Sequence, residues 1–105
     1  MKELTVVQLK QMQDAGETFQ LIDVREEYEV EICSIGAEHI PMGDVLNRAS
    51  EIKKDIPVIV HCRSGARSAN VINALEMQLG YTNLSNLKGG ILAWANEIDN
   101  SLEQY

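Results

Sequence analysis

The sequence predicts a three-layer α/β domain, with a mostly parallel central sheet flanked by helices. Two observations carry this prediction. Apolar runs of strand length alternate with helical patterns along the chain, as in folds built from successive strand and helix units. The run at residues 19–24 is also too continuously apolar for the edge of a sheet, and it fits a parallel strand that is covered on both faces.

The composition is that of a single globular domain, residues 1–105, which is long enough to bury a core. A net charge of −7, without a long run of Lys or Arg, argues against a nucleic-acid partner. The sequence contains neither a signal-peptide pattern nor a run of about eighteen apolar residues, so we expect a cytoplasmic protein with no membrane partner. Its 2 cysteines and 2 histidines do not show the spacing of a disulfide framework or a zinc site, and we expect no metal or other cofactor.

In the first half of the chain, two helical patterns lie on either side of the strand at residues 19–24. Thr5 can cap the first helix, and Gly16 ends it. Its apolar positions are spaced three apart, at Val6, Leu9 and Met12. Residues 26–32 predict a short acidic helix with a solvated face, followed by a turn over 33–37 and a short strand over 38–41.

The second half predicts three more helices and two more strands. A helical pattern runs from residue 43 to residue 54, and a strand begins at Pro57. Another helix begins before Ala69 and continues to Leu79, and residues 83–87 form a last short strand. Residues 88–90 turn the chain into a final helix, whose apolar side places Trp94 in the core, and we expect the acidic tail 99–105 to fray.

The chemistry of the chain is concentrated in the loop that follows residues 58–61. Cys62 stands at the head of this loop, with Arg63 and Arg67 beside it and a helix behind it. The first N–H groups of that helix and the two guanidinium groups should favour the thiolate and lower the pKa of Cys62. Cys62 is therefore the candidate nucleophile, while the alternative is an inert cysteine at the end of a core strand.

Asp23 and Arg25 fall at the carboxyl end of the first predicted strand, the end at which parallel sheets bind ligands. They are supporting candidates for the site. The alternative, which we favour, is a structural role, in which they cap neighbouring loops or form pairs.

Three stretches together resemble the signature motifs of the rhodanese family of sulfurtransferases, in the same order and at the spacing of one domain. These stretches are residues 21–29, residues 60–68 and residues 87–94. The resemblance covers nearly the whole chain. It implies a rhodanese-like fold, a sulfurtransferase activity and no cofactor.

Carried over by position, the resemblance makes Cys62 the cysteine that forms a persulfide. It also implies that the loop amides surround the transferred sulfur, with the loop formed by Arg63, Ser64, Gly65, Ala66, Arg67 and Ser68. Residues 32–37 depart from the family pattern, and Cys33 stands where a histidine is usual. Cys33 is either a passive thiol, which we favour, or a thiol that resolves the persulfide as a disulfide.

The length of the loop separates sulfur transfer from the nearest rival, a cysteine phosphatase or arsenate reductase. Such an enzyme needs five residues between its cysteine and arginine to wrap a phosphate, whereas only the four residues 63–66 separate Cys62 from Arg67. The sequence therefore predicts sulfur transfer from a small anionic donor such as thiosulfate, or from a protein persulfide, to a thiophilic acceptor. The alternative is a carrier that delivers the sulfur to a partner protein in cofactor biosynthesis or tRNA thiolation.

Overall fold

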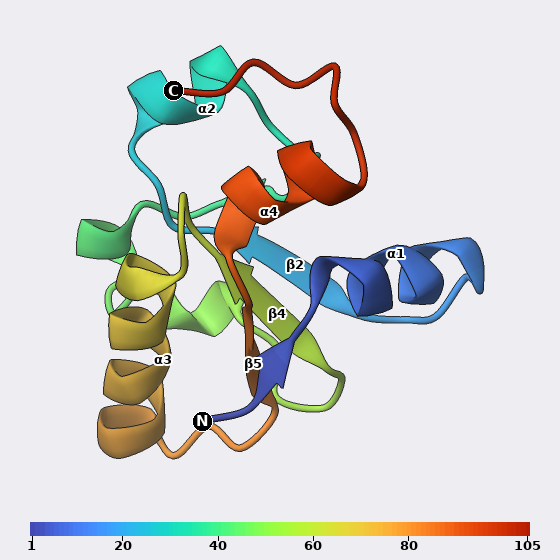
Figure 1. The fold of residues 1–105 in the computed structure, drawn as a ribbon. Coiled ribbons are helices and arrows are strands. Elements are labelled where there is room, and N and C mark those ends of the chain that lie inside the picture. Colours follow the sequence, from blue (N-terminus) through green and yellow to red (C-terminus); the bar gives the residue numbers. More distant parts are fainter.

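A computed structural model describes all residues, 1–105, and its core is one five-stranded sheet with the strand order β1-β5-β4-β2-β3 (Figure 1). Every neighbouring pair in the sheet is parallel. The central strand β4 pairs with β2 so that Asp23 lies opposite His61, which brings the carboxyl ends of the strands to one edge. The strands are β1 (Glu3–Leu4), β2 (Gln20–Asp23), β3 (Glu38–His39), β4 (Val58–His61) and β5 (Leu84–Leu87).

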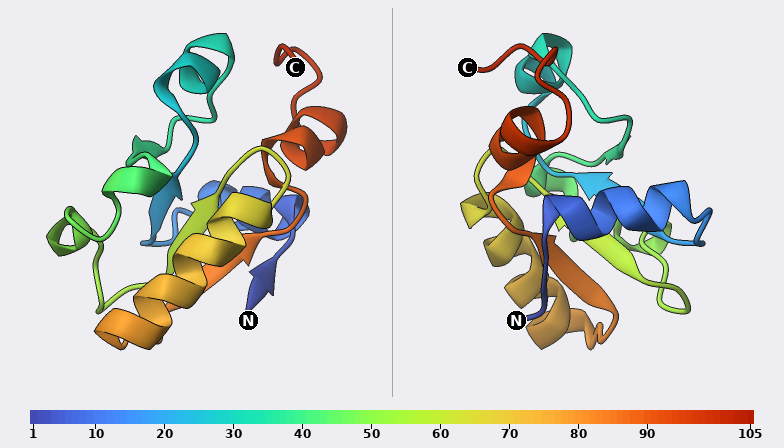
Figure 2. Two further views of the ribbon diagram at one scale, coloured as in Figure 1. Left: turned by 90° about the vertical axis from the view of Figure 1, so that its left-hand side faces the viewer. Right: turned by 45° about the vertical axis from the view of Figure 1, so that its right-hand side comes forward.

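Helices cover both faces of the sheet, which confirms the predicted three layers (Figure 2). On one face, α3 (Ala66–Leu79) packs over β4 and β5. On the other face lie α1 (Val6–Asp14) and α4 (Gly90–Glu97), and the short α2 (Glu27–Ile32) extends beyond the carboxyl edge (Figure 1). None of these helices combines the length and hydropathy needed to cross a bilayer.

Most of the predicted elements form where the sequence places them. A capping box with Gln8 at Thr5 starts α1, and Trp94 is buried in the core as expected. The strand β1 was not predicted, because two residues are too few to show an alternating pattern. It forms because backbone N–H groups of the β5 segment donate to the carbonyls of Lys2 and Leu4.

The helix predicted over residues 43–54 is wrong. This segment instead forms two separate 3₁₀ turns, η1 (Met42–Asp44) and η2 (Ala49–Glu51). Side chains from elsewhere bind the backbone groups that a continuous helix would use. The amide of Gln20 donates to the Glu51 carbonyl and accepts from the Lys53 N–H, and the Tyr81 hydroxyl lies 2.8 Å from the carbonyl oxygens of both Ala49 and Ile52. Tertiary contacts therefore override the local helical pattern.

Two further expectations are corrected beyond the carboxyl edge of the sheet. The acidic helix α2 does not present all of its carboxylates to solvent, because Glu29 is only 2% exposed and is paired with Arg67. The tail is not free, because the Tyr105 side chain hydrogen-bonds to Glu29 and Arg25. Charged patterns alone did not reveal that these residues have partners far away in the sequence.

Candidate active site

Cys62 follows the last residue of β4 and begins the loop that leads into α3. Strand β4 is buried along its whole length, so it fixes the position at which this loop begins. The Cys62 residue is 1% exposed, and its Sγ accepts a hydrogen bond of 3.1 Å from the Gly65 N–H. The Ser68 hydroxyl, from the first turn of α3, lies 3.4 Å from the same sulfur. The sulfur is thus the centre of the loop's hydrogen bonding.

The loop lowers the pKa of Cys62 below its usual value. Burial by itself raises the pKa, but the Ser68 hydroxyl and the backbone N–H groups of Ser68, Gly65 and Ser64 outweigh that effect. The sequence had suggested that the arginine charges would contribute as well. The groups that contact the sulfur are hydrogen-bond donors of the loop, which favour the thiolate through short-range contacts, and the charge of Arg67 interacts with Cys62 in the same sense.

Asn86 on β5 holds the loop in this shape, and sequence reasoning missed it. Its amide donates to the Gly65 carbonyl at 3.0 Å, and its Oδ1 lies 2.5 Å from the Ser68 hydroxyl. The hydroxyl has one proton for three acceptors, namely Asn86 Oδ1, the Gly65 carbonyl and the sulfur, and ionisation of Cys62 favours donation to the sulfur. The only sequence signal for this role was a polar amide in a strand that is otherwise largely buried.

The first turn of α4 binds the backbone at the beginning of the loop. Its N–H groups at Ile91 and Leu92 donate to the carbonyls of Cys62 and Arg63, at 3.0 and 3.1 Å. Gly90 makes this approach possible, because a Cβ at this position would lie 2.5 Å from the Arg63 carbonyl oxygen and 2.6 Å from that of Cys62. Gly90, the first residue of α4, therefore belongs to the support of the site.

Arg67 is held in a charged pair by α2. Its Nη1 and Nη2 donate to the two carboxylate oxygens of Glu29 at 2.6 and 2.8 Å. The hydrogen bonds from Arg67 lower the pKa of Glu29 to about 2. The same hydrogen bonds raise the pKa of Arg67, with smaller contributions of the same sign from the charges of Cys62 and Tyr105. The charge of this arginine is therefore largely compensated within the protein.

Arg63 has a different environment. Its guanidinium lies over the ring of Tyr105, 4.9 Å from the ring centroid, and no side-chain hydrogen bond or carboxylate partner accompanies this contact. Its Nε is buried without a hydrogen-bond partner. Of the two arginines in the loop, Arg63 is the one whose charge is not neutralised by a neighbouring residue.

Asp23 and Arg25 form a buried ion pair of 2.7 Å, with side chains 1% and 0% exposed. The guanidinium of Arg25 also donates to the carbonyls of Glu29 and Cys33, which ties α2 to the sheet. His61 lies beside the pair, with Nε2 at 3.6 Å from Asp23, and burial lowers the pKa of this imidazole. Contacts of this kind are the ones that the sequence interpretation favoured for Asp23 and Arg25, and the structural role of the two residues stays a prediction.

The structure thus brings Cys62, Gly65 and Ser68 into direct contact, and Ser64 adds a backbone N–H. Ala66 begins α3 behind this group. Cys33 is a free thiol whose sulfur lies 3.8 Å from the Arg25 guanidinium, and its role stays a prediction.

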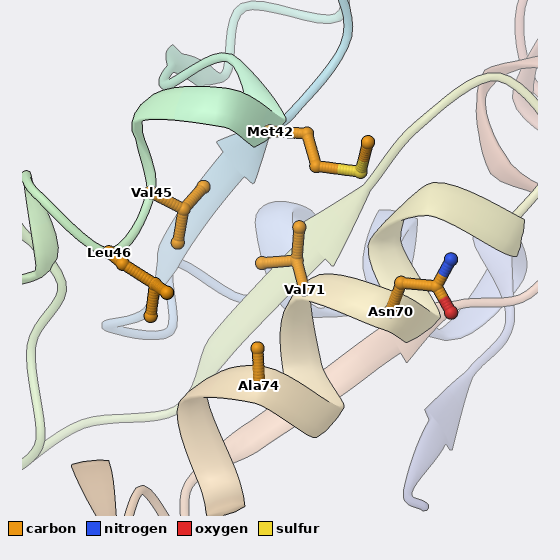
Figure 3. A pocket seen from close by; sticks show the side chains of 6 residues that line it. All are labelled: Met42, Val45, Leu46, Asn70, Val71 and Ala74. Carbon is orange, nitrogen blue, oxygen red and sulfur yellow. The ribbon is translucent and has the colours of Figure 1, made fainter. Parts of the chain in front are cut away.

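An apolar groove between η1 and α3 contains none of the predicted site residues (Figure 3). Figure 3 shows Val45 and Leu46, which follow η1, opposite Val71 and Ala74 of α3. It is lined by Met42, Val45, Leu46, Asn70, Val71 and Ala74. The chemistry-bearing groups lie instead at the carboxyl edge of the sheet.

Comparison with known proteins matches residues 5–97 to the model of the rhodanese-like domain. The chain belongs to this family. The rhodanese-like chain is 41% identical over 97 residues to the provisionally named sulfurtransferase YtwF of Bacillus subtilis, covering 91% of this chain and 92% of that protein. It is 46% identical over 76 residues to a protein named sulfurtransferase from Allochromatium vinosum, covering 71% and 70% of the two chains.

Two further matches extend the comparison. The rhodanese-like chain is 32% identical over 98 residues to the provisionally named sulfur carrier protein YrkF of Bacillus subtilis, covering 92% of this chain and 52% of that protein. The structure of a rhodanese-like domain protein from Staphylococcus aureus superposes with a TM-score of 0.83 at 30% identity, covering 100% and 99% of the two chains. These matches confirm the predicted family and fold class, and they support a sulfurtransferase function in general terms.

Proposed function

We propose that this protein is a rhodanese-type sulfurtransferase that carries a sulfane sulfur on Cys62 as a persulfide. The observation that carries the proposal is the environment of the Cys62 sulfur, which is surrounded by N–H groups and a hydroxyl that lower its pKa. A lower pKa increases the fraction of Cys62 that is thiolate, which is the nucleophilic form, and the same donors stabilise the anion of a persulfide. Relatives named as sulfurtransferases support the same chemistry.

The reaction is a double displacement that needs no metal or organic cofactor. The Cys62 thiolate attacks the outer sulfur of thiosulfate, and a new S–S bond forms as the donor's own S–S bond breaks and sulfite leaves with the electron pair. A thiol or cyanide then attacks the outer sulfur of the persulfide, which releases the Cys62 thiolate. Arg63 is placed to attract the anionic donor, because its charge has no carboxylate partner.

Two features argue against phosphate or arsenate chemistry. Four residues separate Cys62 from Arg67, one fewer than a phosphate-wrapping loop requires. Arg67, which would have to close such a loop, has both Nη atoms bonded to Glu29. Transfer of a single sulfur atom on the cysteine does not require Arg67 to close the loop.

A persulfide carrier that delivers sulfur to a partner protein is the second candidate function. The relative named as a sulfur carrier supports it. The electrostatics support it as well, because Arg67 is neutralised and the chain has a net charge of −7, so a small dianion is drawn to the site only weakly. The acceptor would then be a protein of cofactor biosynthesis or tRNA thiolation.

The test is the intact mass of the purified protein after brief incubation with thiosulfate, and separately with a protein persulfide donor. The wild type should gain one sulfur atom that cyanide removes, and Cys62→Ser should gain none while keeping its melting temperature. Equal labelling of the two proteins would contradict the assignment of Cys62, and the absence of labelling with both donors would contradict sulfur transfer.

The two functions differ in their acceptors. Fast turnover with thiosulfate and cyanide identifies an enzyme acting on small molecules. Slow cyanide turnover, together with rapid transfer of the labelled sulfur to a sulfur-carrier protein, identifies the delivery module.

A further inference from the structure

The Tyr105 side chain joins the two arginines of the active-site loop. Its hydroxyl donates to Glu29 Oε1 at 2.8 Å, the oxygen that also accepts from Arg67. The same hydroxyl accepts from Arg25 Nη1 at 3.0 Å. The face of its ring lies under the guanidinium of Arg63. Two buried charged residues, Arg25 and Glu29, thus hold the tyrosine, and the tyrosine in turn contacts Arg63.

The ring is the main support of the Arg63 guanidinium. No side-chain hydrogen bond or ion pair fixes this group, and its Nε is buried without a hydrogen-bond partner. An aromatic face attracts a guanidinium through the negative charge of its π-system, and it does so without using the N–H groups, which lie in the plane of the cation. The contact therefore holds Arg63 in place and leaves its donors free for an anion.

We propose that Tyr105 is a positioning residue that holds Arg63 ready for the anionic part of a sulfur donor. This rests on the proposed function of the Cys62 loop and adds a specificity element to it. Arg67 is anchored by a carboxylate and contributes little net charge, so discrimination between anionic and uncharged donors depends on Arg63 and on the ring beneath it. The ring contacts the cation directly, and the hydroxyl adds to the placement of the ring.

The inference is tested by the selectivity of Cys62 for a charged reagent over an uncharged one. Iodoacetate and iodoacetamide alkylate the same thiolate and differ mainly in charge, so the ratio of their rate constants reports the attraction of anions to the site. Peptide mapping restricts the measurement to Cys62. In Tyr105→Ala, the iodoacetate to iodoacetamide ratio should fall by about two- to fivefold, as expected for the loss of a partly exposed cation–π contact. Arg63→Gln should lower the ratio in the same direction.

A conservative variant and a matched control separate positioning from a loss of structure. Tyr105→Phe keeps the ring and loses the hydroxyl, so its ratio should stay closer to that of the wild type than the ratio of Tyr105→Ala does. Tyr28 on α2 is 65% exposed, and Tyr28→Ala should leave the ratio unchanged. The wild-type ratio should also fall as salt is added, and that dependence should be weaker in Tyr105→Ala.

The possible failures are distinguishable. A reactive Cys62 whose ratio is the same in Tyr105→Ala and the wild type would overturn the role of Tyr105 and leave the sulfurtransferase assignment standing. A Cys62 that neither reagent modifies would be closed to external donors, which would overturn the proposed function and this inference with it. Equal losses in Tyr105→Phe and Tyr105→Ala would assign the effect to the hydroxyl and contradict support by the ring.

Discussion

Glu29 and Arg67 face each other with two hydrogen bonds of 2.6 and 2.8 Å, although they lie 38 positions apart in the sequence. Glu29 belongs to α2, beyond the carboxyl edge of the sheet, and Arg67 to the first turn of α3. The pair therefore fastens α2 to the active-site loop. Glu29 also accepts from the Glu26 N–H in the capping box of α2, so one carboxylate both starts a helix and holds a loop residue.

Replacing Glu29 by Gln should destabilise the protein in a pH-dependent way. The pKa of Glu29 falls from 4.5 to about 2 on folding, so the charged carboxylate stabilises the folded state above pH 4.5, and this contribution is lost as the pH falls toward 2. At pH 7, Glu29→Gln should lower the free energy of unfolding by about 2 kcal/mol, which is less than for a fully buried pair. Urea unfolding across this pH range measures the difference.

Glu27→Gln is the matched control, because Glu27 is an exposed carboxylate on the same helix. It should change the free energy of unfolding by less than about 0.5 kcal/mol at any pH. A difference between Glu29→Gln and the wild type that persisted unchanged at pH 2 would show that the carboxylate charge is not the cause.

Removing the Ser68 hydroxyl should raise the pKa of Cys62. The hydroxyl is the leading contribution that lowers this pKa, so Ser68→Ala should move the pH profile of Cys62 alkylation to higher pH. At pH 7, the rate should fall by about tenfold, as expected when a thiolate loses one hydrogen bond. Ser64→Ala is the control, because Ser64 acts through its backbone N–H, which alanine keeps. Identical profiles for the two variants would contradict this account.

The sequence was sufficient to predict the layers of the fold and to locate Cys62, the candidate nucleophile, at the end of a central strand, for physical reasons that can be named. Residues 58–61 are all buried, so the apolar run Val58 to Val60 was a reliable signal for a central strand, and Cys62 follows directly after this strand. The small and cationic residues that follow Cys62 in the sequence indicated an anion-binding loop. Residues adjacent in the sequence were therefore enough for these predictions.

Features that depend on distant partners could not be predicted in this way. Glu29 looked like one carboxylate among several on an acidic helix, and only the fold places it against Arg67. Tyr105 looked like the end of a polar tail, and only the fold places its ring under Arg63. The failed helix over residues 43–54 has the same cause, because the side chains of Gln20 and Tyr81 reach it from other elements.

Asp23→Asn should separate a structural role from a catalytic one. Removal of the negative charge leaves the buried guanidinium of Arg25 without its ionic partner, so the free energy of unfolding should fall by about 3 kcal/mol. Below the melting temperature of the variant, persulfide formation per folded molecule should match that of the wild type. The control is Asp14→Asn, which breaks an exposed pair with Lys10. It should lower the free energy of unfolding by less than about 1 kcal/mol. A stable Asp23→Asn protein that formed no persulfide would make Asp23 part of the chemistry.

The contact between α4 and the active-site loop requires a glycine at position 90. A comparison with Gly16 separates the effect of this close contact from the effect of backbone strain. Both glycines have positive φ values, +58° at Gly90 and +67° at Gly16, so an alanine at either position costs about 1–2 kcal/mol in backbone strain. A Cβ at Gly16 meets nothing within 4 Å, whereas at Gly90 it lies 2.5 Å from the Arg63 carbonyl oxygen.

Gly90→Ala should therefore lower the free energy of unfolding by at least about 2 kcal/mol more than Gly16→Ala does, because α4 must move away from the loop or the loop must deform. Either movement breaks the hydrogen bonds from α4 to the Cys62 and Arg63 carbonyls and displaces the sulfur from its donors. Alkylation of Cys62 at neutral pH should slow in Gly90→Ala and stay unchanged in Gly16→Ala. Equal melting temperatures for the two variants would show that the loop does not depend on the close approach of α4.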